Sequence, residues 1–185
     1  MAPSGQLTSP AVEELLRDGT LAGSWTLDPA RSEVRLKTRH TWGLRPLEAV
    51  FSEVNGQGTV TMAGDVSGVI NVGSGSLDTR NPQRDKHLRS AAFFDVANHP
   101  HFTYTVDSVR PAGQGARVEG NLTVRGQTRP APFEATVSAA GDEVTLDGEL
   151  QVNRADFGMR WNFLGIASVH NTLVVHAVFT RAAAA

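Results

Sequence analysis

The sequence predicts an all-β protein folded as one antiparallel, up-and-down β-barrel of about eight strands. From Trp25 onward, apolar and polar residues alternate with a period of two, as expected of strands with one buried and one solvated face. Many alternating segments run for about ten residues and are separated by short turns rather than by helices. Long consecutive strands of this kind favour a closed barrel, because closure removes exposed strand edges.

Residues 1–22 precede the alternating region and are expected to form an appendage with one short amphipathic helix. Ser9 is the expected N-cap, Pro10 occupies the favoured first helical position, and Gly19 ends the helix. Three apolar side chains at helical spacing form one narrow face: Val12, Leu15 and Leu16. A helix of roughly ten residues is marginally stable alone, so we expect this face to dock on the barrel or on a partner.

Residues 23–181 are expected to form the barrel domain. The alternation is clearest in four segments: 33–40, 101–107, 118–125 and 144–153. Further strands are expected near residues 24–28, 47–54, 58–63, 65–72, 130–139 and 172–181. Turns are marked by Asp28-Pro29, Asn55-Gly56, the segment 113–115, Arg125-Gly126 and Gly141-Asp142.

Residues 81–90 interrupt the strand pattern and predict a second short helix, with Asn81 as N-cap and Pro82 at the first helical position. We expect this helix to lie across one end of the barrel as a lid or plug. Charged residues gather around it: Arg80, Arg84, Asp85, Lys86 and Arg89. These cations are expected either to hold a phosphate or pyrophosphate head group, or to form a solvated helix face with an Arg–Asp pair.

The inward faces of the predicted strands carry several small residues: Gly64, Gly68, Gly120, Ala131, Ala135, Gly148 and Ala177. Either they leave a cavity that a ligand must fill, or neighbouring large side chains use the space. A cavity would be lined by apolar side chains from the same faces: Leu36, Phe51, Ile70, Phe102, Tyr104, Leu122, Val124, Phe133 and Leu150. Such a lining suits a hydrocarbon chain. His40 also falls on an inward face, either as a hydrogen-bonded rim residue or as a contact to a ligand's polar head.

The composition argues against several other classes of protein. The formal net charge is −2, which gives no broad electrostatic footprint for nucleic acid or an anionic membrane. The chain has no cysteine, no apolar run long enough to span a bilayer, and no signal-peptide core near Met1, so we expect a cytoplasmic protein without stable membrane insertion. His99 and His101 form an H-x-H pair, but Pro100 separates them at a predicted strand start, so we expect surface histidines rather than metal ligands. The sequence lacks a G-x-S-x-G nucleophile motif. A homodimer is the base-rate expectation.

Several sequence blocks point to a known family. They are Trp25–Val34, Leu77–Thr79, Arg84–Ser90, Phe93–Val96, Gly120–Pro130 and Asn153–Met159. Through these blocks, which keep their expected order, the sequence resembles the YceI-like, polyisoprenoid-binding family of bacterial lipocalin-like barrels. Arg31 and Ala92 depart from the family pattern, which has a histidine at the first position and an acidic residue at the second.

The resemblance implies an apolar tunnel for an isoprenoid chain, often that of an isoprenoid quinone or a polyprenyl phosphate, and no cofactor apart from this ligand. It also implies that Arg84 and Asp85 brace the helix at the barrel mouth, and that Phe94, Phe102 and Phe157 line or close the tunnel. With the alternation, it gives these candidate ligand-binding residues: Leu36, His40, Phe51, Ile70, Arg84, Phe94, Phe102, Tyr104, Leu122, Val124, Phe133, Leu150, Phe157 and Trp161.

The sequence therefore predicts a protein that binds, sequesters or transports an isoprenoid or similar long-chain lipid without a chemical step. Two alternatives stay open at this point. One is an enzyme that uses His40 or Asp85 as a base on a bound isoprenoid. The other is a stress-related scaffold whose N-terminal helix binds a partner protein.

Overall fold

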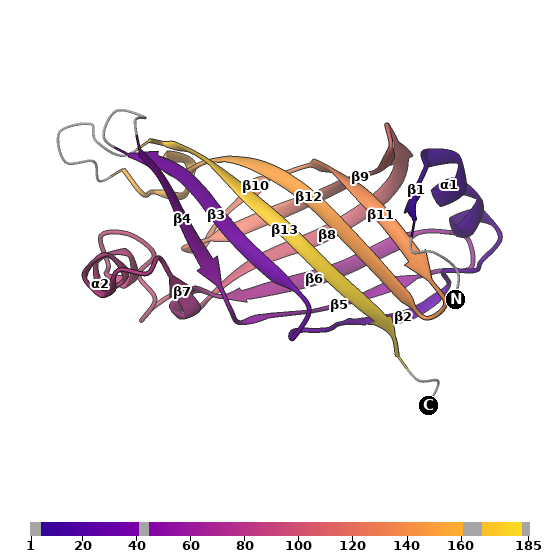
Figure 1. Ribbon diagram of the computed structural model, residues 1–185, viewed down its shortest axis with the longest axis horizontal. Helices are drawn as coiled ribbons and strands as arrows, with labels where there is room; N and C mark the ends of the chain where they lie inside the picture. Colours follow the sequence, from indigo (N-terminus) through magenta and orange to yellow (C-terminus); the bar gives the residue numbers. More distant parts are fainter. Residues whose placement is uncertain (1–4, 41–44, 161–167, 183–185) are drawn as a thin grey trace.

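The computed structural model describes residues 5–40, 45–160 and 168–182, without the side chains of His40 and Arg45. The strands close into an antiparallel barrel of 8 strand positions, with one helix at either end (Figure 1). We call the end covered by α2 (Pro82–Arg89) the mouth and the end covered by α1 (Ser9–Arg17) the base. The strands of the barrel are β2 (Gly23–Leu27), β3 (Glu33–His40), β4 (Arg45–Phe51), β5 (Val54–Val60), β6 (Val66–Gly73), β7 (Leu77–Asp78), β8 (His101–Ala112), β9 (Gly115–Val124), β10 (Gln127–Pro130), β11 (Phe133–Ala140), β12 (Glu143–Asn153) and β13 (His170–Arg181). The predicted fold class is confirmed.

Four of the barrel positions are each occupied by two short strands in succession. β2 and β3 both pair with β13, so together they form one interrupted strand along its edge. β4 and β5 continue one another in the same way, as do β6 and β7, which are joined by the 3₁₀ turn η1 (Ser74–Ser76), and β10 and β11. The break between β2 and β3 falls at the predicted Asp28-Pro29 turn, where the Ser32 hydroxyl oxygen accepts a hydrogen bond from the Val178 N–H (3.0 Å).

The predicted turn at Asn55-Gly56 is wrong. Both residues lie inside β5 and pair with Asn71 and Ile70 of β6. A Cβ atom on Gly56 would lie 2.7 Å from the Val69 carbonyl oxygen, so the glycine allows a close approach of two backbones rather than a reversal of the chain. The strand expected over residues 58–63 ends at Val60, and the chain turns at residues 61–65 instead.

Helix α1 covers the base of the barrel, which is one of the two dockings expected of its apolar face. Val12 and Leu16 are buried in a hydrophobic cluster that they share with Trp25 of β2. The helix begins one residue earlier than expected, with Thr8 at the N-cap position, and Ser9 has another role. The Ser9 hydroxyl donates to the Gly113 carbonyl (2.7 Å) and so ties the helix to the β8–β9 turn.

The segment after α1 closes the base further. The indole N–H of Trp25 donates to the Leu21 carbonyl (2.9 Å), and the Arg181 guanidinium lies 4.5 Å from the Trp25 ring centroid. Arg181 also donates to the Thr20 carbonyl (2.7 Å). The short strand β1 (Gln6–Leu7) pairs with β11 beside this end. Although residues 5–22 pack against the barrel, the division of the chain into an appendage and a barrel domain stays a prediction.

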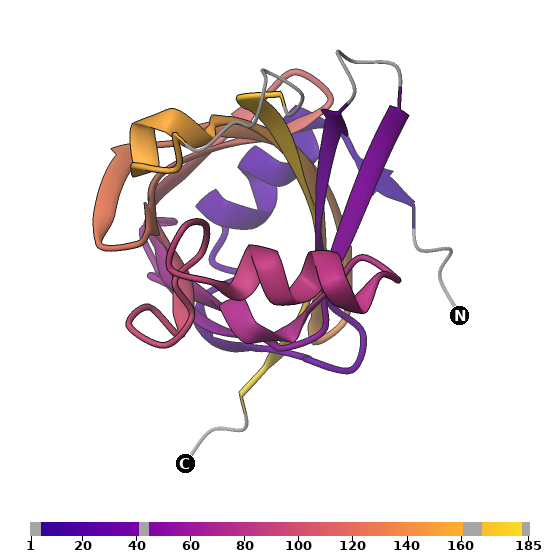
Figure 2. The ribbon, with the colours of Figure 1, turned by 90° about the vertical axis from the view of Figure 1, so that its left-hand side faces the viewer.

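Helix α2 lies across the opposite end, where the sequence placed a lid (Figure 2). The Asn81 side chain caps it by accepting hydrogen bonds from the Gln83 and Arg84 backbone N–H groups, both at 3.1 Å. The chain after α2 folds back over the barrel, where Phe93 and Phe94 are buried. We call residues 79–96 the lid. Within the described ranges, no helix is long and apolar enough to cross a bilayer.

Candidate ligand cavity

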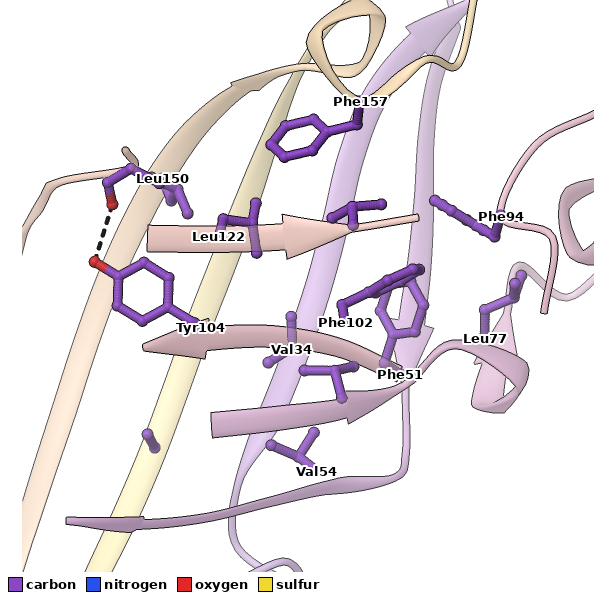
Figure 3. Packing of buried hydrophobic residues seen from close by; sticks show 14 of the residues in the cluster. Val34, Phe51, Val54, Leu77, Phe94, Phe102, Tyr104, Leu122, Leu150 and Phe157 are labelled. Atoms are coloured by element: carbon purple, nitrogen blue, oxygen red, sulfur yellow. Dashed lines mark hydrogen bonds between the residues drawn. The ribbon is translucent and has the colours of Figure 1, made fainter. Parts of the chain in front are cut away.

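The mouth half of the barrel encloses a cavity of about 380 Å³ with an almost entirely apolar lining. Figure 3 shows several of the side chains that line it, among them Phe51, Phe102 and Leu122. Its walls come from alternate residues of the strands, because every second side chain of a strand points inward. On β3, for example, Val34, Leu36 and Thr38 line the cavity, and Leu36 pairs with Leu173 of β13. The lid covers this space at the mouth. The cavity is therefore formed by strands and a lid that are far apart in the sequence.

The cavity is blind, because packed side chains fill the base. The buried residues around α1 form a separate hydrophobic cluster, and none of them lines the cavity. Along β8 the lining ends at Tyr104, since the next inward residue, Val106, is not part of it. A ligand therefore has one apolar space, with the lid at one end and a packed floor at the other.

Most of the predicted ligand-binding residues line this cavity: Leu36, Phe51, Ile70, Arg84, Phe94, Phe102, Tyr104, Leu122, Val124, Phe133, Leu150 and Phe157. Two further predicted residues cannot be placed, and ligand binding by any of these residues stays a prediction. The backbone of His40 ends β3, but its side chain lies outside the described residues, and Trp161 lies outside them altogether.

The sequence reasoning missed lining residues on β4, on β13 and in the lid: Leu47, Ala49, Leu173, Val175, His87, Leu88 and Phe93. On β13, both faces carry apolar residues, with Val174 opposite Leu173, so alternation alone did not select the inward face. On α2, the lining positions Arg84, His87 and Leu88 do have helical spacing, but two of them are polar and the pattern was not apparent.

The small inward residues do not create the cavity. A Cβ atom on Gly120 would lie 2.8 Å from the Tyr104 ring, and one on Gly148 would lie 2.6 Å from the Phe133 ring. The two rings therefore occupy the space above the glycines, with their centroids 5.6 Å apart in an edge-to-face arrangement. The sequence left open whether the small residues leave a cavity or whether large neighbours fill the space. At Gly120 and Gly148, large neighbours fill it. The cavity lies above these rings, on the side of the mouth.

Tyr104 is the polar side chain at the inner end of the cavity. Its hydroxyl donates to the Ala131 carbonyl (2.9 Å), the interaction drawn in Figure 3. Burial raises the pKa of the Tyr104 phenol well above its ordinary value, and the carboxylates of Glu119 and Asp107 raise it further. Tyr104 thus remains a neutral hydrogen-bond donor whose partner is already supplied by the protein.

An aromatic cluster joins the lid to the barrel wall. Phe94 of the lid lies 4.9 Å from Phe102 and 6.2 Å from Phe51, measured between ring centroids. Phe51 and Phe102 meet edge to face at 5.6 Å. All three rings also line the cavity, so a ligand that enters it contacts the same side chains that hold the lid closed.

Buried polar contacts fix the start of the lid. The backbone N–H and the hydroxyl of Thr79 both donate to the Asp85 carboxylate, at 3.0 and 2.5 Å. The Arg84 guanidinium donates to the Thr79 hydroxyl oxygen and to the Thr79 carbonyl, both at 2.8 Å. Asp85 is only 6% exposed, so its carboxylate is committed to this network.

Arg89 fixes the end of the helix. Its guanidinium donates to the carbonyls of Gly75 in η1 (3.0 Å) and of Leu77 in β7 (2.6 Å). Among the described residues the expected Arg–Asp pair does not form: Asp85 bonds to Thr79, and Arg84 and Arg89 bond to backbone carbonyls. These contacts hold the lid on the barrel. Binding of a phosphate head group by this cluster stays a prediction.

The polar residues of the lining gather near the mouth: Thr38, Arg84, His87, Arg154, Ser168 and Asn171. Arg154, in the 3₁₀ turn η2 (Arg154–Phe157), is only 6% exposed, and this burial lowers the pKa of its guanidinium. It donates to the carbonyls of Ser168 (3.0 Å) and Met159 (2.6 Å). The cavity is therefore almost entirely apolar, and its few polar residues lie near the mouth.

The described residues do not contain a group of three or more His, Cys, Asp or Glu side chains placed to hold a metal ion. Asp85, one of the bases considered in the enzyme alternative, is not among the residues that line the cavity. The arrangement is suited to hold an elongated amphiphile, since apolar surface is available along the walls and hydrogen-bonding groups at the rim.

Comparison with known families decides the relationship. The YceI-like domain family matches residues 25–180, which is nearly the whole barrel. The chain belongs to this family. Protein YceI of Salmonella arizonae is 35% identical over 112 residues, which cover 57% of this chain and 58% of that protein. The chain thus spans a little over half the length of the curated relatives that it matches.

Solved structures show the same YceI-like barrel. BcnA of Burkholderia cenocepacia superposes with a TM-score of 0.74 at 23% sequence identity, covering 82% of this chain and 98% of BcnA. A polyisoprenoid-binding domain of Saccharophagus degradans, implicated in plant cell wall breakdown, gives a TM-score of 0.69 at 15% identity, covering 85% and 98% of the two chains. At these identities the similarity establishes the fold that the chains share.

Proposed function

We propose that this YceI-like protein binds one isoprenoid or similar long-chain lipid in its barrel and sequesters or transports it without a chemical step. The observation that carries the proposal is the blind apolar cavity with its polar residues at the rim. Each Å² of apolar surface removed from water contributes about 25 cal/mol, so a hydrocarbon chain gains most where the lining is continuous and apolar. The polyisoprenoid-binding domain with the same fold supports an isoprenoid as the ligand.

The size of the cavity supports a single chain. At about 380 Å³ it lies near the lower end of ordinary small-molecule sites. The polar end of the molecule, expected to be that of an isoprenoid quinone or a polyprenyl phosphate, then lies toward the mouth. The cytoplasmic location and a homodimer stay predictions.

The structure gives little support to an enzyme that uses Asp85 as a base on a bound isoprenoid. The Asp85 carboxylate bonds to Thr79 in the lid and lies outside the lining, so it does not face a bound chain. The geometry therefore favours a binding protein.

Cavity-filling variants test the proposal by calorimetric titration with farnesol. Phe102→Trp adds volume to a lining position, and each methylene that it displaces from the cavity costs about 0.8 kcal/mol of binding free energy. We expect the affinity to fall by roughly tenfold or more, as the displacement of two methylenes predicts. Leu173→Trp, on the opposite wall, should act in the same direction.

Phe179→Trp is the matched control, because Phe179 packs against the core without lining the cavity. It should bind farnesol as the wild-type protein does. Thermal unfolding must first show that all four proteins are folded. Equal binding by the wild type, both cavity variants and the control would then contradict a lipid site inside the barrel.

A further inference from the structure

A second recess lies outside the barrel, beside the mouth. It is a cleft of about 430 Å³ between the β9–β10 turn, η2 and the residue that precedes Pro100. Unlike the cavity, it is lined mainly by polar atoms. Three arginines reach it from separate segments, together with one histidine and one acidic residue: Arg125, Arg129, Arg160, His99 and Asp156. We call this recess the cationic cleft.

Positive charge is concentrated in the cationic cleft. Three guanidinium groups face one lining carboxylate, that of Asp156, although the whole chain carries a formal net charge of −2. Within the described part of the chain, none of the three guanidiniums lies within ion-pair distance of a carboxylate. Arginines brought together without acidic partners favour an anion, and their planar forks match the oxygens of a phosphate group.

Arg125 is held in place by the neighbouring segments. It occupies the first position of the β9–β10 turn with a φ of 51°, a left-handed conformation that Asn or Gly adopts more readily in such turns. Its guanidinium donates to the carbonyls of Ala91 (3.2 Å) and Gly158 (3.5 Å). Arg125 thus links the lid, the turn and η2 around the cationic cleft.

The cleft adjoins the lipid cavity. Phe157 lines both, so the two spaces meet at this residue. The strand pairing leaves a break in the barrel wall nearby. Among the described residues, β10 pairs only with β9, and residues 149–153 of β12 pair only with β13, so no backbone ladder joins these two parts of the wall.

We propose that the cationic cleft binds a phosphate or diphosphate group. Two sources fit this chemistry. The group is either the head of a lipid whose chain occupies the cavity and passes Phe157, or part of a free phosphate compound. The lipid source rests on the proposed function, whereas binding of the free anion does not depend on it.

The first arm of the test titrates the full chain with inorganic pyrophosphate at low salt. The double variant Arg129→Gln/Arg160→Gln should bind at least about tenfold more weakly than the wild type, because it loses charge-assisted hydrogen bonds to the anion. Both residues are exposed, so the barrel should tolerate the change. Arg17→Gln/Arg110→Gln removes the same charge from exposed positions on α1 and β8 and should leave pyrophosphate binding unchanged.

The second arm compares farnesyl diphosphate with farnesol. If the cleft holds a lipid head group, the diphosphate binds at least about tenfold more tightly than the alcohol, and the Arg129→Gln/Arg160→Gln variant loses this difference while it keeps its affinity for farnesol. Binding of pyrophosphate without such a difference would identify a free phosphate compound as the source.

Two results overturn the proposal. One is the absence of both pyrophosphate binding and any preference for the diphosphate. The other is an equal loss in the Arg17→Gln/Arg110→Gln control, because general electrostatic attraction would then explain the binding. If farnesol itself does not bind, the proposed lipid function fails, but the pyrophosphate arm still decides for or against the anion site.

Discussion

Tyr104 and Phe133 determine where the cavity ends. Their rings lie over Gly120 and Gly148, at positions where a Cβ atom would collide with them. From the sequence alone, an inward glycine indicates unfilled space in the barrel. The structure shows that an aromatic residue on the adjacent strand fills this space. The residues most informative about the cavity are therefore the cross-strand pairs of ring and glycine, which one strand read alone does not reveal.

The Tyr104 hydroxyl gives a prediction for this floor. Tyr104→Phe keeps the ring but leaves the buried Ala131 carbonyl without its donor, so we expect a loss of about 1–3 kcal/mol in the free energy of unfolding. Urea unfolding measures it. An unchanged unfolding free energy would mean that the hydroxyl makes no stabilising contact.

The same residue predicts how stability changes at high pH. Burial raises the pKa of the Tyr104 phenol in the folded state, so the folded protein retains this proton more strongly than the unfolded chain does. This contribution to stability is constant below the ordinary tyrosine pKa of about 10 and is lost as the pH rises above it. The chain has 1 tyrosine, so phenolate absorbance reports this group alone. An ionisation midpoint at the ordinary value would contradict the buried placement, and Tyr104→Phe should abolish the signal.

The lid and α1 illustrate how two short helices acquire different roles at the two ends. Helix α1 uses apolar residues to fill the base, whereas α2 is held mainly by polar contacts of Thr79, Asp85 and Arg89. The sequence predicted α2 from its Asn81 cap and Pro82, and α1 from Pro10 and its apolar spacing, although Ser9 is not the N-cap. The family resemblance implied that Arg84 and Asp85 brace the lid, but not that Thr79 is their partner or that Arg89 bonds to the carbonyls of Gly75 and Leu77, because the folded chain determines these positions.

Asp85 tests the anchoring of the lid. Asp85→Ala removes the acceptor of two Thr79 hydrogen bonds, and we expect a loss of about 1–3 kcal/mol in unfolding free energy together with faster amide exchange at Phe94 and Val96. Lys86→Ala, at an exposed position of the same helix, should stay within about 0.5 kcal/mol of the wild type. Similar exchange rates in both variants would show that Asp85 does not hold the lid.

At the scale of the whole molecule, the sequence predicted the barrel, both helices and part of the cavity wall. Period-two alternation succeeds because each strand has one face inside a closed sheet, as Leu36, Leu122 and Leu150 show. It cannot say how far side chains reach across the barrel, since that depends on the stagger between strands. Arg154 was missed for a related reason: it follows the end of β12, where no periodicity indicates which way a side chain points.

The central claim is that the mouth half of the barrel holds one lipid chain. Native mass spectrometry of the purified protein, followed by organic extraction of the same sample, tests it most directly. We predict an intact mass equal to the chain plus one lipid molecule, an extract that contains a single isoprenoid class, and loss of the added mass in Phe102→Trp. A native mass equal to that of the chain alone, unchanged after incubation with an isoprenoid alcohol or quinone, would contradict the account.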